Sequence, residues 1–284
     1  MHSKNTTADC RGCPAPYRDE RVLTLRREEL TQGKIPVRIF PEEKDVFTYL
    51  AQTMADIIQQ HDREAKPTLM IVPLGPVGQY EYLAEMINQN NISLKQTTFL
   101  NMDEYMWDDK TFIDPAHPLS FRGAMNRLFY DRVKPELLMP EVQRIFPDFE
   151  SMEKVYALIQ SHGGVDLCVG GLGLNGHVAF NEPQPAMDID TFMQLPARVV
   201  PVAPETLVVN GLNEYEGAYE LMPRFAATLG FREIAASKRI VLGCFRPWHK
   251  MVVRKAALYP PTTEFPVSLL QDMDMEICIP QKLV

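Results

Sequence analysis

The chain has 284 residues, 45% of them hydrophobic and 23% charged, which is an ordinary composition for a globular protein with a buried core. A formal net charge of −8 argues against nucleic acid or an anionic membrane as a partner, because both require a basic surface. No apolar run approaches the roughly 18 residues of a membrane span, and the first residues lack the apolar core of a signal peptide, so we expect a cytoplasmic protein.

Residues 1–34 are expected to form a mobile N-terminal extension, and residues 35–284 a single domain. The extension contains a CxxC pair, Cys10 and Cys13. A zinc site needs about four ligands, and only His2 is close to this pair in sequence. We therefore favour two solvent-accessible thiols over a metal site.

Short apolar runs of strand length alternate with amphipathic helical patterns from residue 35 onward. The expected strands are residues 35–40, 68–74, 97–101, 165–171, 239–244 and 275–280. The expected helices follow Pro41, lie at about 79–90, 121–129 and 150–161, and end with one that begins at Pro247. This alternation predicts an α/β fold with a doubly wound, mostly parallel sheet and helices on both faces. No elements are assigned between residues 184 and 235.

The strand expected at 97–101 is followed by an acidic pair, Asp103 and Glu104. Ligands of open parallel sheets bind outside the carboxyl ends of the strands, so polar residues at such positions are candidates for chemistry. Acidic residues there can also simply cap a helix or lie in a solvated turn. In the functional interpretation, Asp103 lies in the cleft as a general base, with a pKa raised by burial toward neutrality.

The strand expected at 165–171 leads into a glycine-rich loop in which Gly171, Gly173 and Gly176 match the pattern GxGxxG. A dinucleotide site is rejected because that pattern must open a helix, whereas an apolar VAF run follows here. The glycines are expected to let the backbone turn sharply and approach a ligand closely. On the same loop, His177 and Glu182 are either incidental polar residues or a candidate acid/base pair.

The strand expected at 239–244 is followed by a cluster of basic residues: Arg246, His249, Lys250, Arg254 and Lys255. A helix that begins at Pro247 would direct Lys250 and the free N–H groups of its first turn at one place, which would form an anion site. The alternative is a basic, solvated helix face, to which Arg254 and Lys255 are assigned.

The segment NMDEY (101–105), followed by GGLGLNGHVAFNEP (170–183), resembles the paired signature segments of glucosamine-6-phosphate deaminases. The segments 117–133 and 265–271 are also similar to that family, and the resemblance covers about residues 35–284. The related 6-phosphogluconolactonases share the fold and a similar glycine–histidine loop but lack the FNEP ending. The resemblance therefore implies a Rossmann-like fold of the deaminase/isomerase type.

The resemblance also implies roles for individual residues. Asp103 would be the base that moves a proton between C2 and C1 of the open-chain sugar. His177 would open the pyranose ring, with Glu182 as its charged partner, and no metal or organic cofactor would be needed. A homo-oligomer is expected as well. Four apolar residues near the carboxy terminus are expected to form either a subunit contact or ordinary core: Leu269, Leu270, Met273 and Met275.

The sequence departs from the family pattern in three places. Asn175 stands where the family has an aspartate, so it can orient His177 by hydrogen bonding but cannot add charge. The phosphate loop reads PLGPVGQY (73–80), in which Gly75 and Gly78 remain to contact a phosphate but the hydroxyl side chains are missing. No residue matches the family's arginine between the second signature and the next strand, for which Arg198 or Arg224 could substitute.

Together these features predict an aldose–ketose isomerase or deaminase that acts on an amino sugar phosphate such as glucosamine 6-phosphate. Gly75, Gly78, Lys250, Gly171 and Gly173 are the expected substrate- or phosphate-binding residues. The alternatives are a lactonase-like hydrolase on the same fold, in which His177 activates water, and a catalytically silent sugar-phosphate-binding protein. The presence of Asp103 disfavours the silent protein, because binding alone does not need a carboxylate there.

Overall fold

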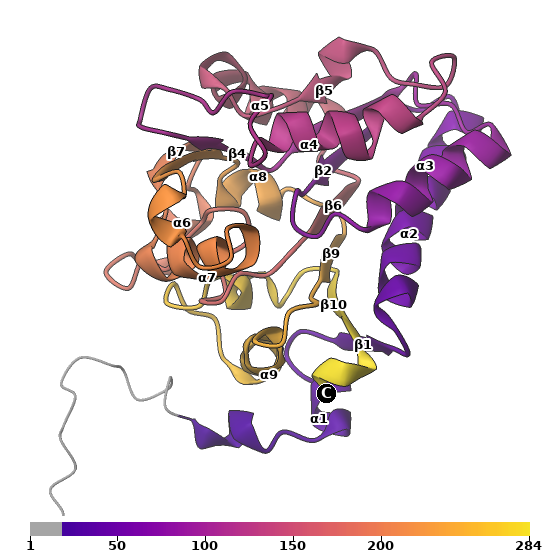
Figure 1. The fold of residues 1–284 in the computed structure, drawn as a ribbon. Helices are drawn as coiled ribbons and strands as arrows, with labels where there is room; N and C mark the ends of the chain where they lie inside the picture. The colour runs from indigo at the N-terminus through magenta and orange to yellow at the C-terminus, as the bar shows by residue number, and fades with distance from the viewer. Residues whose placement is uncertain (1–18) are drawn as a thin grey trace, which may run out of the picture.

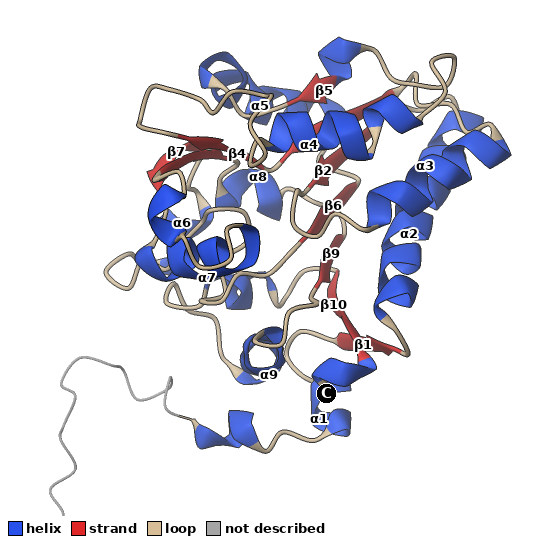
Figure 2. Ribbon diagram, in the orientation of Figure 1, coloured by secondary structure: helices blue, strands red, loops and turns tan. Residues whose placement is uncertain are grey.

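The computed structural model describes residues 19–284. Its centre is a seven-stranded sheet in which every adjacent pair of strands is parallel (Figures 1 and 2). The strands, in spatial order, are β1 (Val37–Phe40), β10 (Met275–Pro280), β9 (Ile240–Gly243), β6 (Leu167–Gly170), β2 (Thr68–Val72), β3 (Thr97–Asn101) and β5 (Arg144–Ile145). The short β5 was not expected from the sequence. The parallel sheet confirms the predicted fold class.

The helices that lie against this sheet or along its edges are α1 (Arg27–Thr31), α2 (Glu43–Arg63), α3 (Gln79–Asn90), α4 (Phe121–Leu128), α5 (Phe149–His162), α8 (Phe231–Ala235) and α9 (His249–Leu258). Figure 1 shows α2 and α3 on one side of the strands and α8 and α9 on the other. No helix within residues 19–284 is long and apolar enough to cross a membrane.

Side chains of the central strands alternate between two hydrophobic cores, one on each face of the sheet. In β2, Leu69 and Ile71 belong to one core, while Met70 and Val72 belong to the other. All four side chains are almost completely buried. Successive strand residues point to opposite faces, so a strand covered by helices on both sides must be apolar throughout. This explains why β2 appears in the sequence as a continuous apolar run.

A second, antiparallel sheet of three strands lies beside the first and was not predicted. It consists of β4 (Asp103–Met106), β8 (Phe225–Thr228) and β7 (Arg198–Pro201), in the order β4-β8-β7. Strands β7 and β8, with α6 (Ile189–Met193) and α7 (Pro204–Glu214), lie within residues 184–235, where no elements were assigned from the sequence (Figure 2). Strand β4 pairs with a strand far along the chain, Asp103 opposite Thr228, so short-range patterns do not reveal this sheet.

The described part of the N-terminal extension, residues 19–34, is packed against the domain rather than free. Leu30 is fully buried, and Val22 and Leu25 join the same core as α9. Arg254 of α9 donates hydrogen bonds to the carbonyl oxygens of Val22 (3.1 Å) and Leu23 (2.8 Å). The expected boundary at residue 35 is therefore wrong for this segment, because its apolar side chains complete the core. Cys10 and Cys13 lie outside the described residues.

The four apolar residues considered for a subunit contact belong to the core as well. Leu270 and Met275 are buried, and Leu269 and Met273 pack against the same cluster. The interpretation of this group as ordinary core agrees with the structure.

Candidate active site

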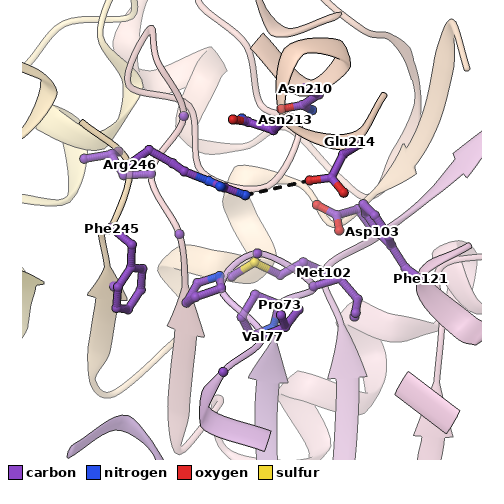
Figure 3. A pocket seen from close by; sticks show the side chains of 18 of the residues that line it. Pro73, Val77, Met102, Asp103, Phe121, Asn210, Asn213, Glu214, Phe245 and Arg246 are labelled. Carbon is purple, nitrogen blue, oxygen red and sulfur yellow. Dashed lines mark ion pairs between the residues drawn. The ribbon is translucent and has the colours of Figure 1, made fainter. Parts of the chain in front are cut away.

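A cavity of about 750 Å³ lies at the carboxyl ends of the central strands. It receives residues from the loop after β2, from β4, from the loop after β6, from the loop after β9, and from α7. Figure 3 shows Asp103 and Glu214 on one side of this cavity and Arg246 on the other. The volume lies within the range usual for small-molecule sites, and the position is the one expected for an open parallel sheet.

Asp103 is the first residue of β4 and lines the cavity, although its side chain is almost completely buried. Burial, with a smaller contribution from the charge of Glu104, raises the pKa of Asp103 to about 8. A carboxyl group with such a pKa can both accept and release a proton near neutral pH.

Glu104, the neighbour of Asp103, points away from the cavity and caps α4. Its carboxylate accepts hydrogen bonds from the backbone N–H groups of Phe121 (2.9 Å) and Arg122 (2.8 Å) and from the Ser120 hydroxyl (3.1 Å). Adjacent residues of a strand point to opposite sides, so one acidic pair serves two purposes. The helix-cap interpretation thus applies to Glu104, while Asp103 stays a candidate base.

His177, Glu182 and Asn175 form one hydrogen-bonded group at the glycine-rich loop. His177 Nδ1 lies 2.8 Å from Asn175 Oδ1 and 3.0 Å from Glu182 Oε2. Two acceptors face this nitrogen, so Nδ1 carries a hydrogen, and Nε2 is the ring nitrogen left to exchange a proton with a ligand. Burial opposes ionisation of Glu182, but the charge and hydrogen bond of His177 and the hydrogen bond from Asn175 outweigh it and lower the pKa of Glu182 to about 2.

The predicted glycines line the cavity and allow close approach within the protein. A Cβ atom on Gly173 would lie 2.1 Å from the His177 ring, and one on Gly171 would lie 2.3 Å from the carbonyl oxygen of Gly75. A Cβ on Gly78 would meet the Phe47 ring at 2.7 Å, whereas one on Gly75 would meet nothing within 4 Å. At Gly171 and Gly173, then, a side chain would separate the two loops or displace the histidine.

Lys250 does not line the cavity, contrary to the prediction that it anchors an anion. Helix α9 begins at His249, and the ammonium group of Lys250 donates a hydrogen bond to the carbonyl oxygen of Val284. Arg246, which lies in the loop before the helix, does line the cavity. Its side chain is 51% exposed, and Nη2 lies 3.9 Å from the Glu214 carboxylate. Lys282 also lines the cavity.

His249 fixes the loop that carries Arg246. Its Nδ1 accepts hydrogen bonds from the backbone N–H groups of Phe245 (3.1 Å) and Arg246 (2.8 Å), so Nε2 carries the hydrogen and donates it to the carbonyl oxygen of Leu172 (2.8 Å). Burial, with a smaller contribution from Arg246, lowers the pKa of His249 to about 4. A neutral imidazole thus joins the loop after β9 to the glycine-rich loop.

Helix α7 contributes residues that the sequence analysis missed. Asn210, Asn213 and Glu214 line the cavity (Figure 3), and Asn210 Nδ2 donates a 2.9 Å hydrogen bond to the hydroxyl of Tyr105. The start of α7 carries a recognisable signal, because Pro204 at the first turn is followed by an acidic residue. No pattern in the sequence indicates that this helix lies over the cavity.

Neither arginine considered as a substitute lines the cavity. Arg198 instead donates hydrogen bonds to Asn181 Oδ1 (2.9 Å) and to the carbonyl oxygen of Pro196 (3.1 Å). Within residues 19–284, no three His, Cys, Asp or Glu side chains are grouped as metal ligands.

Solved structures define the class of protein to which this fold and cavity belong. A monomeric glucosamine-6-phosphate deaminase is similar with a TM-score of 0.73 and 25% identity, over 87% of this chain and 98% of that one. The 6-phosphogluconolactonase of Thermotoga maritima has a TM-score of 0.61 at 14% identity, over 86% of this chain and 99% of that one, and shares the fold. The class is the α/β fold common to sugar-phosphate deaminases and lactonases. No family model matches the chain.

Curated relatives narrow this class to one family. Glucosamine-6-phosphate deaminase of Geobacillus sp. (strain WCH70) is 31% identical over 229 residues, which cover 78% of this chain and 84% of the relative. Glucosamine-6-phosphate deaminase 2 of Bacillus subtilis (strain 168) is 30% identical over 229 residues, 78% of this chain and 86% of the relative. Glucosamine-6-phosphate deaminase of Rhodopirellula baltica (strain DSM 10527 / NCIMB 13988 / SH1) is 30% identical over 243 residues, which cover 84% of this chain and 89% of the relative. The chain belongs to the glucosamine-6-phosphate deaminase family, and the resemblance seen in the two signature segments is confirmed.

Proposed function

We propose that this protein is an aldose–ketose isomerase and deaminase that acts on an amino sugar phosphate, either glucosamine 6-phosphate or a close relative of it. The observation that carries the proposal is that one cavity holds a carboxyl group with a pKa near 8, Asp103, and an imidazole whose Nε2 is free to exchange a proton, His177. Isomerisation through an enol needs two proton transfers, one to open the sugar ring and one between neighbouring carbons.

Asp103 is suited to the transfer between C2 and C1. Its carboxylate takes the proton from C2 of the open-chain sugar and returns it to C1, so the group ends in the state in which it began. A buried carboxylate is the stronger base because the charged form is poorly solvated. A substrate that carries an ammonium group on C2 would favour the ionised form of Asp103 on binding.

His177 is suited to ring opening. Glu182 and Asn175 hold the hydrogen on Nδ1, which leaves Nε2 to move a proton between the anomeric hydroxyl and the ring oxygen. The Glu182 carboxylate stabilises the imidazolium that forms on the way. Asn175 orients the His177 ring but carries no charge, so of these two residues only Glu182 stabilises the imidazolium by its charge.

Arg246 is the proposed anchor for the phosphate. The side chain projects into the cavity opposite Asp103, and its 3.9 Å contact with Glu214 is long enough to leave donors for an anion (Figure 3). The guanidinium can bind two oxygens of one phosphate at once. Gly75 and Gly78 of the loop after β2 line the same cavity, and backbone N–H groups in this loop can take the place of the missing hydroxyl side chains.

The direct test is a screen of purified protein against amino sugar phosphates and their unphosphorylated forms, with ammonia release and ketose formation measured in parallel. We expect turnover of glucosamine 6-phosphate or a close relative, and deuterium at C1 of the ketose product in deuterated water. Lactone hydrolysis without solvent exchange into the sugar would instead identify the hydrolase alternative. Binding without turnover would identify a silent protein.

The homo-oligomer remains a prediction, and the similar deaminase of known structure is monomeric. Light scattering at the working concentration tests this prediction. A particle with the mass of one chain would contradict the homo-oligomer.

A further inference from the structure

Asn175 is in contact with a second carboxylate besides that of Glu182. Its Nδ2 donates hydrogen bonds to Glu182 Oε2 (2.7 Å) and to Glu205 Oε1 (3.0 Å). Glu205 lies in the first turn of α7 and is exposed at the edge of the site, far in sequence from the glycine-rich loop. The roles assigned so far to the loop and the cavity do not use this residue.

Two carboxylates determine which way the Asn175 amide points. An ionised carboxylate only accepts hydrogen bonds, so Glu182 and Glu205 both require the NH₂ end of the amide. The carbonyl end is then left to face His177, where Oδ1 lies 2.8 Å from Nδ1 and 3.3 Å from the backbone nitrogen. In the flipped orientation, the NH₂ group would oppose two other donors. Both hydrogens of the amide are used in the observed orientation.

We propose that Glu205 is a positioning residue for His177, acting through the orientation of Asn175. The proposal rests on the proposed function of His177 as a proton carrier. Glu205 also links the helix above the cavity to the glycine-rich loop, while Asn210 on the same helix is bonded to the hydroxyl of Tyr105. Helix α7 is therefore bonded to a neighbour of each proton-transfer group: to Asn175, which contacts His177, and to Tyr105, which lies in the same strand as Asp103.

The same geometry explains why an amide rather than a carboxylate suits position 175. An aspartate there would be a third carboxylate beside Glu182 and Glu205 and would have no hydrogen to donate to either. Asn175 and Glu205 thus form a matched pair. A glutamine at position 205 would restore a donor toward an aspartate at position 175, so the two substitutions should compensate each other.

The test is a kinetic comparison of Glu205→Ala, Glu205→Gln, Asn175→Asp and the double variant Asn175→Asp/Glu205→Gln, with Glu220→Gln as the control for loss of an exposed carboxylate nearby. We expect Glu205→Ala to lower kcat about tenfold with KM changed less than about twofold, and Glu205→Gln to lower it far less because its carbonyl still accepts from Asn175. Asn175→Asp should lower kcat about 10- to 100-fold, and the added Glu205→Gln should recover most of this loss. The control should match the wild type.

A spectroscopic measurement separates this proposal from the proposed function. Nitrogen NMR of the His177 ring reports the share of the Nδ1–H tautomer, with or without turnover. We expect Glu205→Ala to reduce that share and Glu205→Gln to preserve it. The proposal is overturned if Glu205→Ala leaves the tautomer signal unchanged, or if Asn175→Asp is not relieved by Glu205→Gln. A wild type that turns over no sugar phosphate would refute the proposed function alone, since the NMR result would still decide the role of Glu205.

Discussion

The cavity has two walls that are built differently. On the proton-transfer wall, His177 is fixed by Asn175 and Glu182, and Asp103 is held in a strand. On the opposite wall, Arg246 is half exposed and has one long contact with Glu214. In the proposed mechanism, proton transfer therefore depends on side chains positioned before the substrate arrives, whereas the proposed anion site gains much of its order from the substrate itself.

The largest effect is expected at Asp103. Asp103→Asn should lower kcat by about 10²–10⁴, because the general base is lost, and should abolish deuterium exchange into the sugar. Since burial disfavours the charged carboxylate, the variant should melt no earlier than the wild type above about pH 8. The pKa of Asp103 is higher in the folded protein than in the unfolded chain. The folded protein therefore loses stability as the pH rises from the ordinary aspartate pKa of 3.8 to about 8. Retention of full exchange in this variant would contradict the mechanism.

The next effect tests the fixed geometry of His177. A methyl group on Gly173 would lie 2.1 Å from the imidazole, so Gly173→Ala should displace the ring and lower kcat about 10²-fold. Gly75→Ala is the comparison for kcat on the anion-binding wall, because a Cβ there meets no protein atom within 4 Å. Both are measured by steady-state kinetics alongside melting temperature. Equal loss in the two variants would show that the proton-transfer wall is no more sensitive to geometry than the anion-binding wall.

A smaller effect, confined to binding, is expected on the opposite wall. Arg246→Ala should raise KM for a phosphorylated sugar about 10- to 100-fold with little change in kcat, because a charge-assisted contact to a remote phosphate contributes about 1.5–3 kcal/mol in both ground and transition states. Lys250→Ala is the control, since Lys250 contacts Val284 instead. If Lys250→Ala proved the more damaging, the anchor would have been assigned to the wrong residue.

The smallest effect concerns the pH profile. A base must be unprotonated, so kcat/KM of the wild type should fall as the pH drops below about 8, the pKa of Asp103 in the empty cavity. Glu104→Gln removes the smaller of the two causes of that high pKa and should move this limb to lower pH by less than about one unit. Asp131→Asn, which removes an exposed carboxylate elsewhere, should leave the limb in place. A profile that is flat between pH 6 and pH 9 would contradict a pKa of about 8 for the base.

The comparison of the two walls also explains what the sequence could reveal. The central strands were predictable because burial on both faces makes them continuous apolar runs, and Asp103, His177 and Glu182 could be put forward as candidates because each lies just past such a strand or on its loop. The antiparallel sheet and the place of α7 above the cavity depend on pairing between distant segments, which leaves no local pattern.

Lys250 lies outside the cavity for a local reason. Helix α9 begins two residues later than Pro247 suggested, and the lysine in its first turn lies toward Val284 instead of the cavity. The direction of a side chain at a helix start depends on the starting residue, and sequence patterns place that residue only to within a turn.

The packing of residues 19–34 on α9 has a practical consequence for shortened forms of this protein. A chain that starts at residue 35 would uncover the side of α9 that packs on this segment, including Ala257 beside Gly33, and would leave Arg254 without its two carbonyl acceptors. Exposed apolar helix faces promote aggregation. The same helix follows the loop of Arg246, so a trimmed protein should be less soluble and bind phosphorylated sugars more weakly, even though every signature segment is intact.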